Sequence, residues 1–121
     1  MSVLFITASP QDLLNEFNKR IAQKEEQGKV KTWLRHKDQV HYTHDSDNWR
    51  NDAFFKPIIV KDGLRFVIVP PEGSNISSLV YAYYHGHLTQ TFLDHFDKMF
   101  TYAVSSAYPE HGDIVASPAK S

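Results

Sequence analysis

The sequence predicts an α+β domain in which helices pack on one face of a mainly antiparallel sheet of four to five strands. Three observations predict this class: an apolar segment followed by an amphipathic helix, two hairpin-like pairs of segments, and helical periodicity late in the chain. The chain has 121 residues, of which 41% are hydrophobic and 22% charged, as in a typical folded domain. We place this single domain at residues 1–108 and a flexible tail at 109–121, where all periodicity is lost.

The first two elements are a strand and a helix. Residues 2–8 are rich in β-branched and aromatic side chains, which favour a strand. Ser9 and Pro10 then supply a helix cap and a proline at the first helical position. Gly28 is expected to end the helix, because glycine readily adopts the left-handed conformation found at that point. Between these signals runs one apolar stripe at helical spacing, formed by Leu13, Leu14, Phe17 and Ile21.

Two hairpins are expected next, formed by residues 30–36 with 40–44 and by residues 54–60 with 64–69. The second hairpin has Asp62-Gly63 at its turn, a pair that tolerates the positive φ of a tight connection. Pro57 has no amide hydrogen to donate to a neighbouring strand. Its strand is therefore expected at an edge of the sheet, or Pro57 at the start of its strand.

The C-terminal part of the domain allows two interpretations over residues 76–86. Residues 79–84 have strand-like side chains, but a helical stripe is also present, formed by Ile76, Leu79, Val80 and Tyr83. A second helical stripe predicts a helix over residues 88–105. Because the two stripes are out of phase around Gly86, we favour helix for both pieces, as one long C-terminal helix that is kinked or broken there.

Composition excludes several classes of function. Lys and Arg number 13 and Asp and Glu 14, so the chain lacks the charge bias of proteins that coat nucleic acids. The absence of cysteine excludes disulfides, thiolate chemistry and Cys-type zinc sites. The scattered glycines form no phosphate-binding motif, and we expect no cofactor. The apolar start at residues 2–8 is too short for a signal peptide or a membrane span, so we expect a cytoplasmic protein with no membrane contact.

The most concentrated group of chemistry-bearing side chains is His85-Gly86-His87, with Asp94 and His95 downstream. On a strand the two imidazoles would share a face and could hold a metal together, whereas on a helix they diverge. On the favoured helix, His85 is a core imidazole bonded to a hydroxyl or carbonyl, and His87 lies on a polar face with Thr91 and Asp94. No metal is then expected. The candidate functional pocket comprises Tyr81, Tyr84, His85, His87, Thr91, Asp94 and His95.

Three functional hypotheses result. The 16 aromatic residues exceed what so small a core is expected to cover, which favours a non-enzymatic binding protein. It would form a homodimer or bind a protein partner through the aromatic-rich C-terminal helices. The alternative is a metal-binding protein or metal-dependent enzyme that uses His85, His87, Asp94 and His95. The third is single-stranded nucleic-acid binding by a strand face that carries Lys31, Trp33 and Arg35, against which the balanced charge argues.

Overall fold

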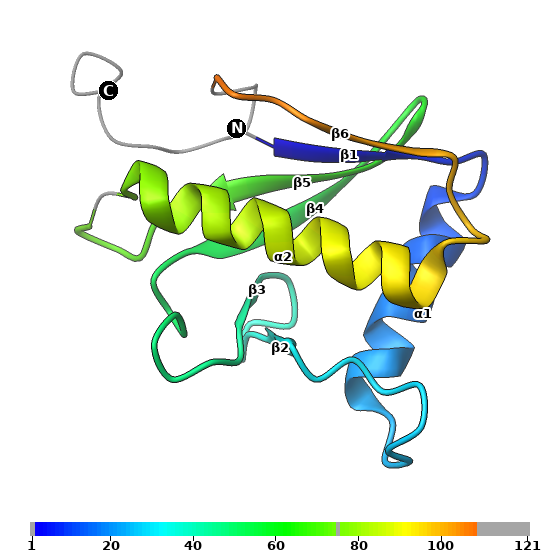
Figure 1. Ribbon diagram of the computed structural model, residues 1–121, viewed down its shortest axis with the longest axis horizontal. Helices are drawn as coiled ribbons and strands as arrows, with labels where there is room; N and C mark the ends of the chain where they lie inside the picture. The colour runs from blue at the N-terminus through cyan, green and yellow to red at the C-terminus, as the bar shows by residue number, and fades with distance from the viewer. Residues whose placement is uncertain (1, 75, 109–121) are drawn as a thin grey trace.

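The computed structural model describes residues 2–74 and 76–108 and confirms the α+β class with an antiparallel sheet. In this part of the chain the sheet has six strands, where four to five were predicted, in the order β2-β3-β4-β5-β1-β6. Figure 1 shows α2 crossing in front of the sheet. The elements are β1 (Ser2–Ile6), α1 (Pro10–Ala22), β2 (Trp33–Arg35), β3 (Tyr42–His44), β4 (Phe54–Val60), β5 (Gly63–Val69), α2 (Ser78–Phe96) and β6 (Tyr102–Ser105).

Helix α1 begins at Pro10 as predicted but ends at Ala22, so the predicted end at Gly28 is wrong. The backbone of Gln23 is extended, and its side-chain amide donates to two carbonyls of the turn that follows. The apolar stripe stops at Ile21, and the polar residues after it offer no face for packing. Gly28 does have a positive φ of 79°, but it serves the loop that returns the chain to the sheet.

The predicted second hairpin is confirmed as β4 and β5, which pair from Phe54↔Val69 to Val60↔Gly63. Gly63 is required here, because a Cβ at this position would lie 2.0 Å from the carbonyl oxygen of Phe5. The first hairpin is shorter than predicted, with only three residues in each of β2 and β3. Strand β4 lies inside the sheet, which corrects the predicted edge position. Pro57 is tolerated because β3 pairs with β4 only at Tyr42↔Phe55.

The hydrophobic core lies between one face of the sheet and both helices. Phe17 of α1 contacts the rings of Phe66 on β5 and Phe92 on α2, with centroids 5.7 and 5.0 Å apart. Phe92 also stacks on Phe5 of β1 at 4.1 Å. The expected excess of exposed aromatic surface is therefore wrong for most of these rings. The fully buried ones are Trp33, Tyr42, Tyr84, Phe5, Phe17, Phe55, Phe66, Phe92 and Phe96.

The C-terminal region differs most from the prediction. Helix α2 is one continuous element across Gly86, capped by the Ser77 hydroxyl, which accepts a hydrogen bond from the Val80 amide. It ends at Phe96, because residues 102–105 form strand β6 and pair with β1, whose N–H and C=O groups need partners on that edge. The predicted tail at 109–121 lies outside the described residues. In the described part, neither helix is both long and apolar enough to cross a membrane.

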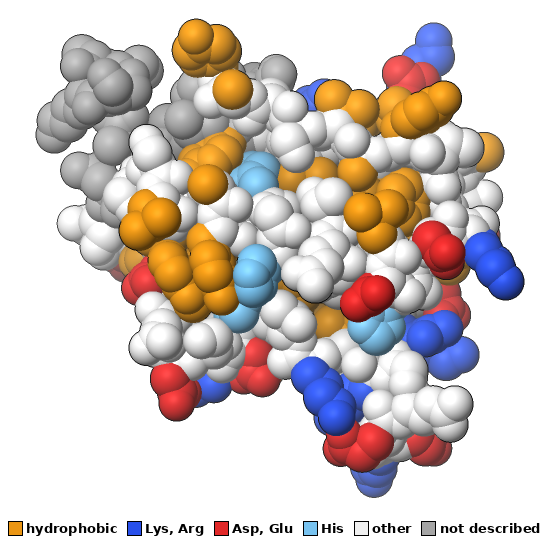
Figure 2. Space-filling model, in the orientation of Figure 1, with side chains coloured by type: hydrophobic (Ala, Val, Ile, Leu, Met, Phe, Trp, Pro, Cys, Tyr) orange, Lys and Arg blue, Asp and Glu red, His pale blue; other side chains and the backbone are white. Residues whose placement is uncertain are grey.

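The face of the molecule that α2 crosses is unevenly charged. Figure 2 shows Lys, Arg, Asp and Glu side chains mainly along its lower and right-hand margins. The centre of this face is occupied by uncharged side chains and by histidines. The side of α2 that is turned to solvent is therefore largely neutral.

Candidate functional site

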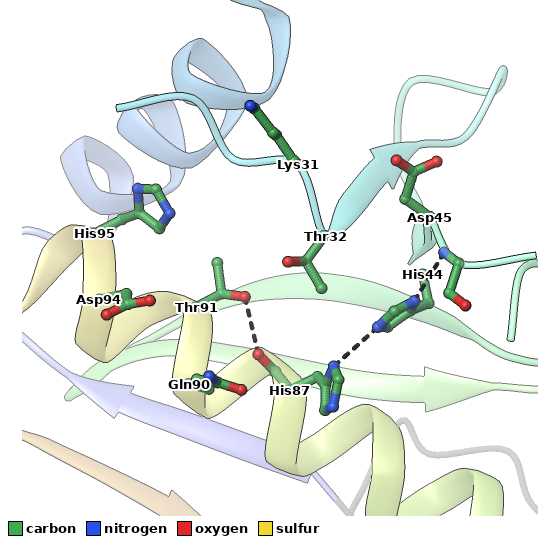
Figure 3. Close-up of a pocket in the computed structure, with 10 residues that line it drawn as sticks. Lys31, Thr32, His44, Asp45, His87, Gln90, Thr91, Asp94 and His95 are labelled. Atoms are coloured by element: carbon green, nitrogen blue, oxygen red, sulfur yellow. Dashed lines mark hydrogen bonds between the residues drawn. The ribbon is translucent and has the colours of Figure 1, made fainter. Parts of the chain in front are cut away.

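A polar cleft of about 440 Å³ lies between α2 and the chain segments that lead into β2 and out of β3. Figure 3 shows the two walls facing each other, one formed by successive turns of α2 and the other by the β2 and β3 region. Every lining side chain carries a hydrogen-bonding group. The lining residues are Lys31, Thr32, His44, Asp45, Ser46, His87, Gln90, Thr91, Asp94 and His95.

The structure divides the predicted pocket residues into two groups. His87, Thr91, Asp94 and His95 line the cleft. The first three were expected on one polar face of the helix. Tyr81, Tyr84 and His85 point into the hydrophobic core instead. The prediction therefore identified four of the α2 side chains in the cleft and placed three core side chains with them.

His85 is a core imidazole, as the helical interpretation predicted. The residue is 6% exposed, and its ring stacks on Tyr81 with a centroid distance of 4.0 Å. Its Nδ1 atom lies 2.7 Å from the Tyr81 carbonyl oxygen, to which it donates one turn back along the helix. Since His87 faces the cleft, the two neighbouring imidazoles diverge and do not share a ligand.

His87 instead meets His44 of β3, 43 residues earlier in the chain. The His44 Nε2 and His87 Nδ1 atoms are 3.0 Å apart. The backbone N–H of Ser46 donates to His44 Nδ1 at 3.0 Å, so this nitrogen is unprotonated and neutral His44 carries its proton on Nε2. His44 therefore donates to His87, whose own proton lies on the opposite ring nitrogen, Nε2.

This arrangement opposes protonation of His44, whose side chain is buried with 4% of the residue exposed. Burial lowers the pKa of His44 from its ordinary value of 6.5 to about 4. The nearby His87 contributes to this lowering of the pKa, while Asp45 acts in the opposite direction. A second proton on His44 would also face the Ser46 N–H, a donor against a donor. At neutral pH, His44 is an uncharged wall of the cleft.

Hydrogen bonds across the core hold both imidazoles in place. The indole N–H of Trp33 donates to the Thr91 hydroxyl at 3.0 Å, and this hydroxyl donates to the His87 carbonyl at 2.9 Å. Trp33 is also paired with His44 across β2 and β3. The strand that carries His44 is thereby tied to the helix that carries His87.

The Tyr84 hydroxyl makes a second tie between α2 and the loop after β3. It lies 3.1 Å from the Thr43 hydroxyl, donates to the Trp49 carbonyl and accepts from the Ala53 amide. Burial raises the pKa of Tyr84 above its ordinary value of 10.0, so the hydroxyl keeps its proton. Tyr84 thus supports the cleft from beneath and is not exposed to a ligand.

The predicted nucleic-acid face is not formed. Trp33 is 1% exposed and its indole is committed to Thr91, so no base can stack on it. Lys31 lies before β2, lines the cleft and pairs with Glu26. Arg35 lies on the exposed end of β2 and donates to the Gln39 backbone carbonyl at 2.7 Å. The alternation that was expected to align the three side chains starts only at Trp33, where the strand begins.

The cleft contains two kinds of polar group. The imidazoles of His44 and His87 and the Thr91 hydroxyl are engaged in hydrogen bonds inside the protein. By contrast, the side chains of Gln90, Asp94 and His95 make no hydrogen bond or ion pair within the described residues. No group of three or more His, Cys, Asp or Glu side chains in this part of the chain could hold a metal ion.

The predicted pocket did not include the wall opposite α2. This wall is formed by short segments around β2 and β3, with Thr32, His44, Asp45 and Ser46. Gln90 was also missed, although it lies one turn before Asp94 and could have been found by extending the polar face of the helix. His44 shares a strand face with Tyr42, and this alternation is a signal that could have indicated its burial, but not its partner.

Comparison with known proteins adds no functional information. No protein-family model, no curated protein and no solved structure matches this chain. The geometry of the cleft is thus the basis for a functional assignment.

Proposed function

We propose that this chain is a cytoplasmic, non-enzymatic binding protein whose cleft beside α2 receives a basic side chain of a protein partner. The observation that carries the proposal is that some polar side chains of the cleft are hydrogen-bonded inside the protein, whereas others have no partner within the described residues. His44 and the Nδ1 atom of His87 already use their lone pairs inside the protein, so these nitrogens form the wall of the cleft and do not act as general bases. Gln90, Asp94 and His95 are open to a ligand.

The charges of the cleft favour a cationic group. Lys31 is paired with Glu26, and Asp45 accepts from the Arg50 guanidinium at 2.9 Å. Asp94 has no such partner among the described residues, so one carboxylate is left uncompensated in the cleft. Hydrogen bonds between a guanidinium or ammonium group and a carboxylate are among the strongest in proteins, and the side-chain oxygen of Gln90 can accept a further one.

A titration monitored by amide NMR tests this proposal with small probes. N-acetyl-arginine amide is expected to shift the amide signals of His87, Gln90 and Asp94 at millimolar concentration, whereas N-acetyl-glutamate amide is not. Asp94→Asn is expected to weaken these shifts at least tenfold, since it removes the charge and keeps the shape. The matched control is Asp12→Asn, an exposed acid of α1 that lies outside the cleft and away from the outward side of α2. Equal binding of both probes, or binding unchanged in Asp94→Asn, would contradict the proposal.

The two other hypotheses find less support. A metal-dependent enzyme would need His85 in the cleft, and this residue is packed in the core. Binding of single-stranded nucleic acid would need an exposed aromatic platform at Trp33, which is buried. The cytoplasmic location remains a prediction from the sequence.

A further inference from the structure

No element of the described residues covers the outward side of α2. It lies opposite the face that packs on the core through Tyr81, Leu88 and Phe92. Leu79 and Leu93 stand on it with 70% and 54% of their surface exposed. The exposed residues between them include Ala82, Gly86 and Gln90, which carry no charge. In Figure 2 the corresponding centre of this face is neutral.

Gly86 has no evident role within a single copy of the chain. It lies in the middle of a 19-residue helix, where glycine is less favourable than alanine. A Cβ atom at this position would meet nothing within 4 Å, so no neighbour in the same copy requires its absence. A glycine on an exposed helix surface does allow another backbone to approach closely.

The spacing on this side of α2 is symmetric about Gly86. Leu79 precedes Gly86 by seven residues and Leu93 follows it by seven, about two helical turns in each direction. If a second α2 packs antiparallel with Gly86 on a two-fold axis, Leu79 of each copy meets Leu93 of the other. A surface that is complementary to itself in this way is what a two-fold dimer requires.

The charges at the two ends of α2 fit the same arrangement. The first turn of the helix contains no acidic residue, and Asp97 follows directly after the last turn. An acidic side chain is unfavourable near the C-terminus of its own helix and favourable near an N-terminus. Antiparallel packing brings Asp97 of one copy beside the N-terminus of α2 in the other, twice per dimer.

We propose that this protein forms a two-fold symmetric homodimer in which the outward sides of α2 pack antiparallel, with Gly86 at the axis. The apolar contacts are made by the two Leu79–Leu93 pairs, and each Asp97 caps the opposing helix. This surface meets the cleft only at Gln90. The Leu79 and Leu93 variants therefore test the dimer without changing Asp94, and Asp94→Asn tests ligand binding without changing the two leucine pairs.

Sedimentation velocity with charged variants tests both the surface and its direction. The wild-type chain is expected to sediment at twice its mass of 13.9 kDa at concentrations between about 10 μM and 1 mM. Leu79→Lys and Leu93→Asp are each expected to sediment as monomers, because each places two unpaired charges in the interface. An equimolar mixture of the two variants is expected to form dimers again, since one pair becomes Lys–Asp and the other stays Leu–Leu.

Two controls separate loss of the interface from loss of the fold. Leu34→Lys changes an exposed leucine of β2 and is expected to leave the dimer intact. Gly86→Leu is expected to abolish the dimer and keep the circular dichroism spectrum of the wild type, because its side chain points into open space in the monomer. A monomeric wild type, or dimeric Leu79→Lys and Leu93→Asp variants, would overturn the proposal. Failure of the mixture to pair would overturn the antiparallel arrangement.

Discussion

The buried imidazole of His44 makes the stability of the protein depend on pH in a defined interval. The folded protein protonates His44 only near pH 4, whereas an unfolded chain does so near 6.5. Between these values the unfolded state binds more protons, so the free energy of unfolding falls as the pH is lowered through this interval. At about 1.4 kcal/mol per pH unit, the loss from this one group amounts to about 3 kcal/mol, with no further loss below pH 4.

His44→Gln isolates this contribution, because glutamine does not titrate and its amide can still donate to His87. Urea unfolding, followed by tryptophan fluorescence at several pH values between about 7 and 4, gives the free energy of unfolding of each protein. As the pH is lowered, the free energy of unfolding of the wild type is expected to fall by about 3 kcal/mol more than that of the variant. Carboxylates common to both proteins cancel in this difference.

The matched control is His36→Gln, which removes an imidazole that contacts Phe54 outside the cleft. This variant shows how the removal of a histidine outside the cleft alters the dependence of the free energy of unfolding on pH. Parallel curves for the wild type and His44→Gln, after comparison with this control, would refute the assignment of a neutral, hydrogen-bonded imidazole at position 44.

Three further substitutions test how the walls of the cleft and the sheet are held. Thr91→Val leaves the buried indole N–H of Trp33 without an acceptor and is expected to cost about 1–3 kcal/mol in urea unfolding, whereas Thr91→Ser retains most of the stability. Gly63→Ala is expected to lower stability by about 2–4 kcal/mol or to prevent folding, because its Cβ collides with the Phe5 carbonyl; unchanged stability would disprove the close approach. Tyr84→Phe removes the hydroxyl that ties the loop after β3 to α2, and faster hydrogen exchange in that loop is the expected result.

Local sequence signals predicted the elements that are stabilised locally. Pro10 marks the start of α1, and the Asp62-Gly63 turn identifies the β4–β5 hairpin. The predicted end of the C-terminal helix was wrong because apolar residues continue at helical spacing beyond Phe96. Strand β6 forms there by pairing with β1. Because β1 lies about a hundred residues earlier in the chain, no local pattern reveals that pairing.

The candidate site was predictable to a similar extent. Helical spacing alone put His87, Thr91 and Asp94 on one polar face, which the cleft confirms. The pairing of His87 with His44 depends on the packing of α2 against β3, and helical spacing contains no information about it. The prediction of exposed aromatic surface from the composition was wrong, because most aromatic residues fill the core and few rings are left for contact with a partner.

Substitutions in the cleft should affect either the stability of the protein or its affinity for a ligand, depending on whether the side chain is hydrogen-bonded inside the protein. Changes at His44 or Thr91, whose hydrogen bonds lie inside the protein, should reduce stability more than affinity. Changes at Gln90 or Asp94, which are exposed and lack internal partners in the described chain, should reduce affinity and leave the unfolding curve unchanged. If Asp94→Asn instead lowered stability by more than about 1 kcal/mol, its carboxylate would have a structural partner, and the argument for a basic ligand would lose its basis.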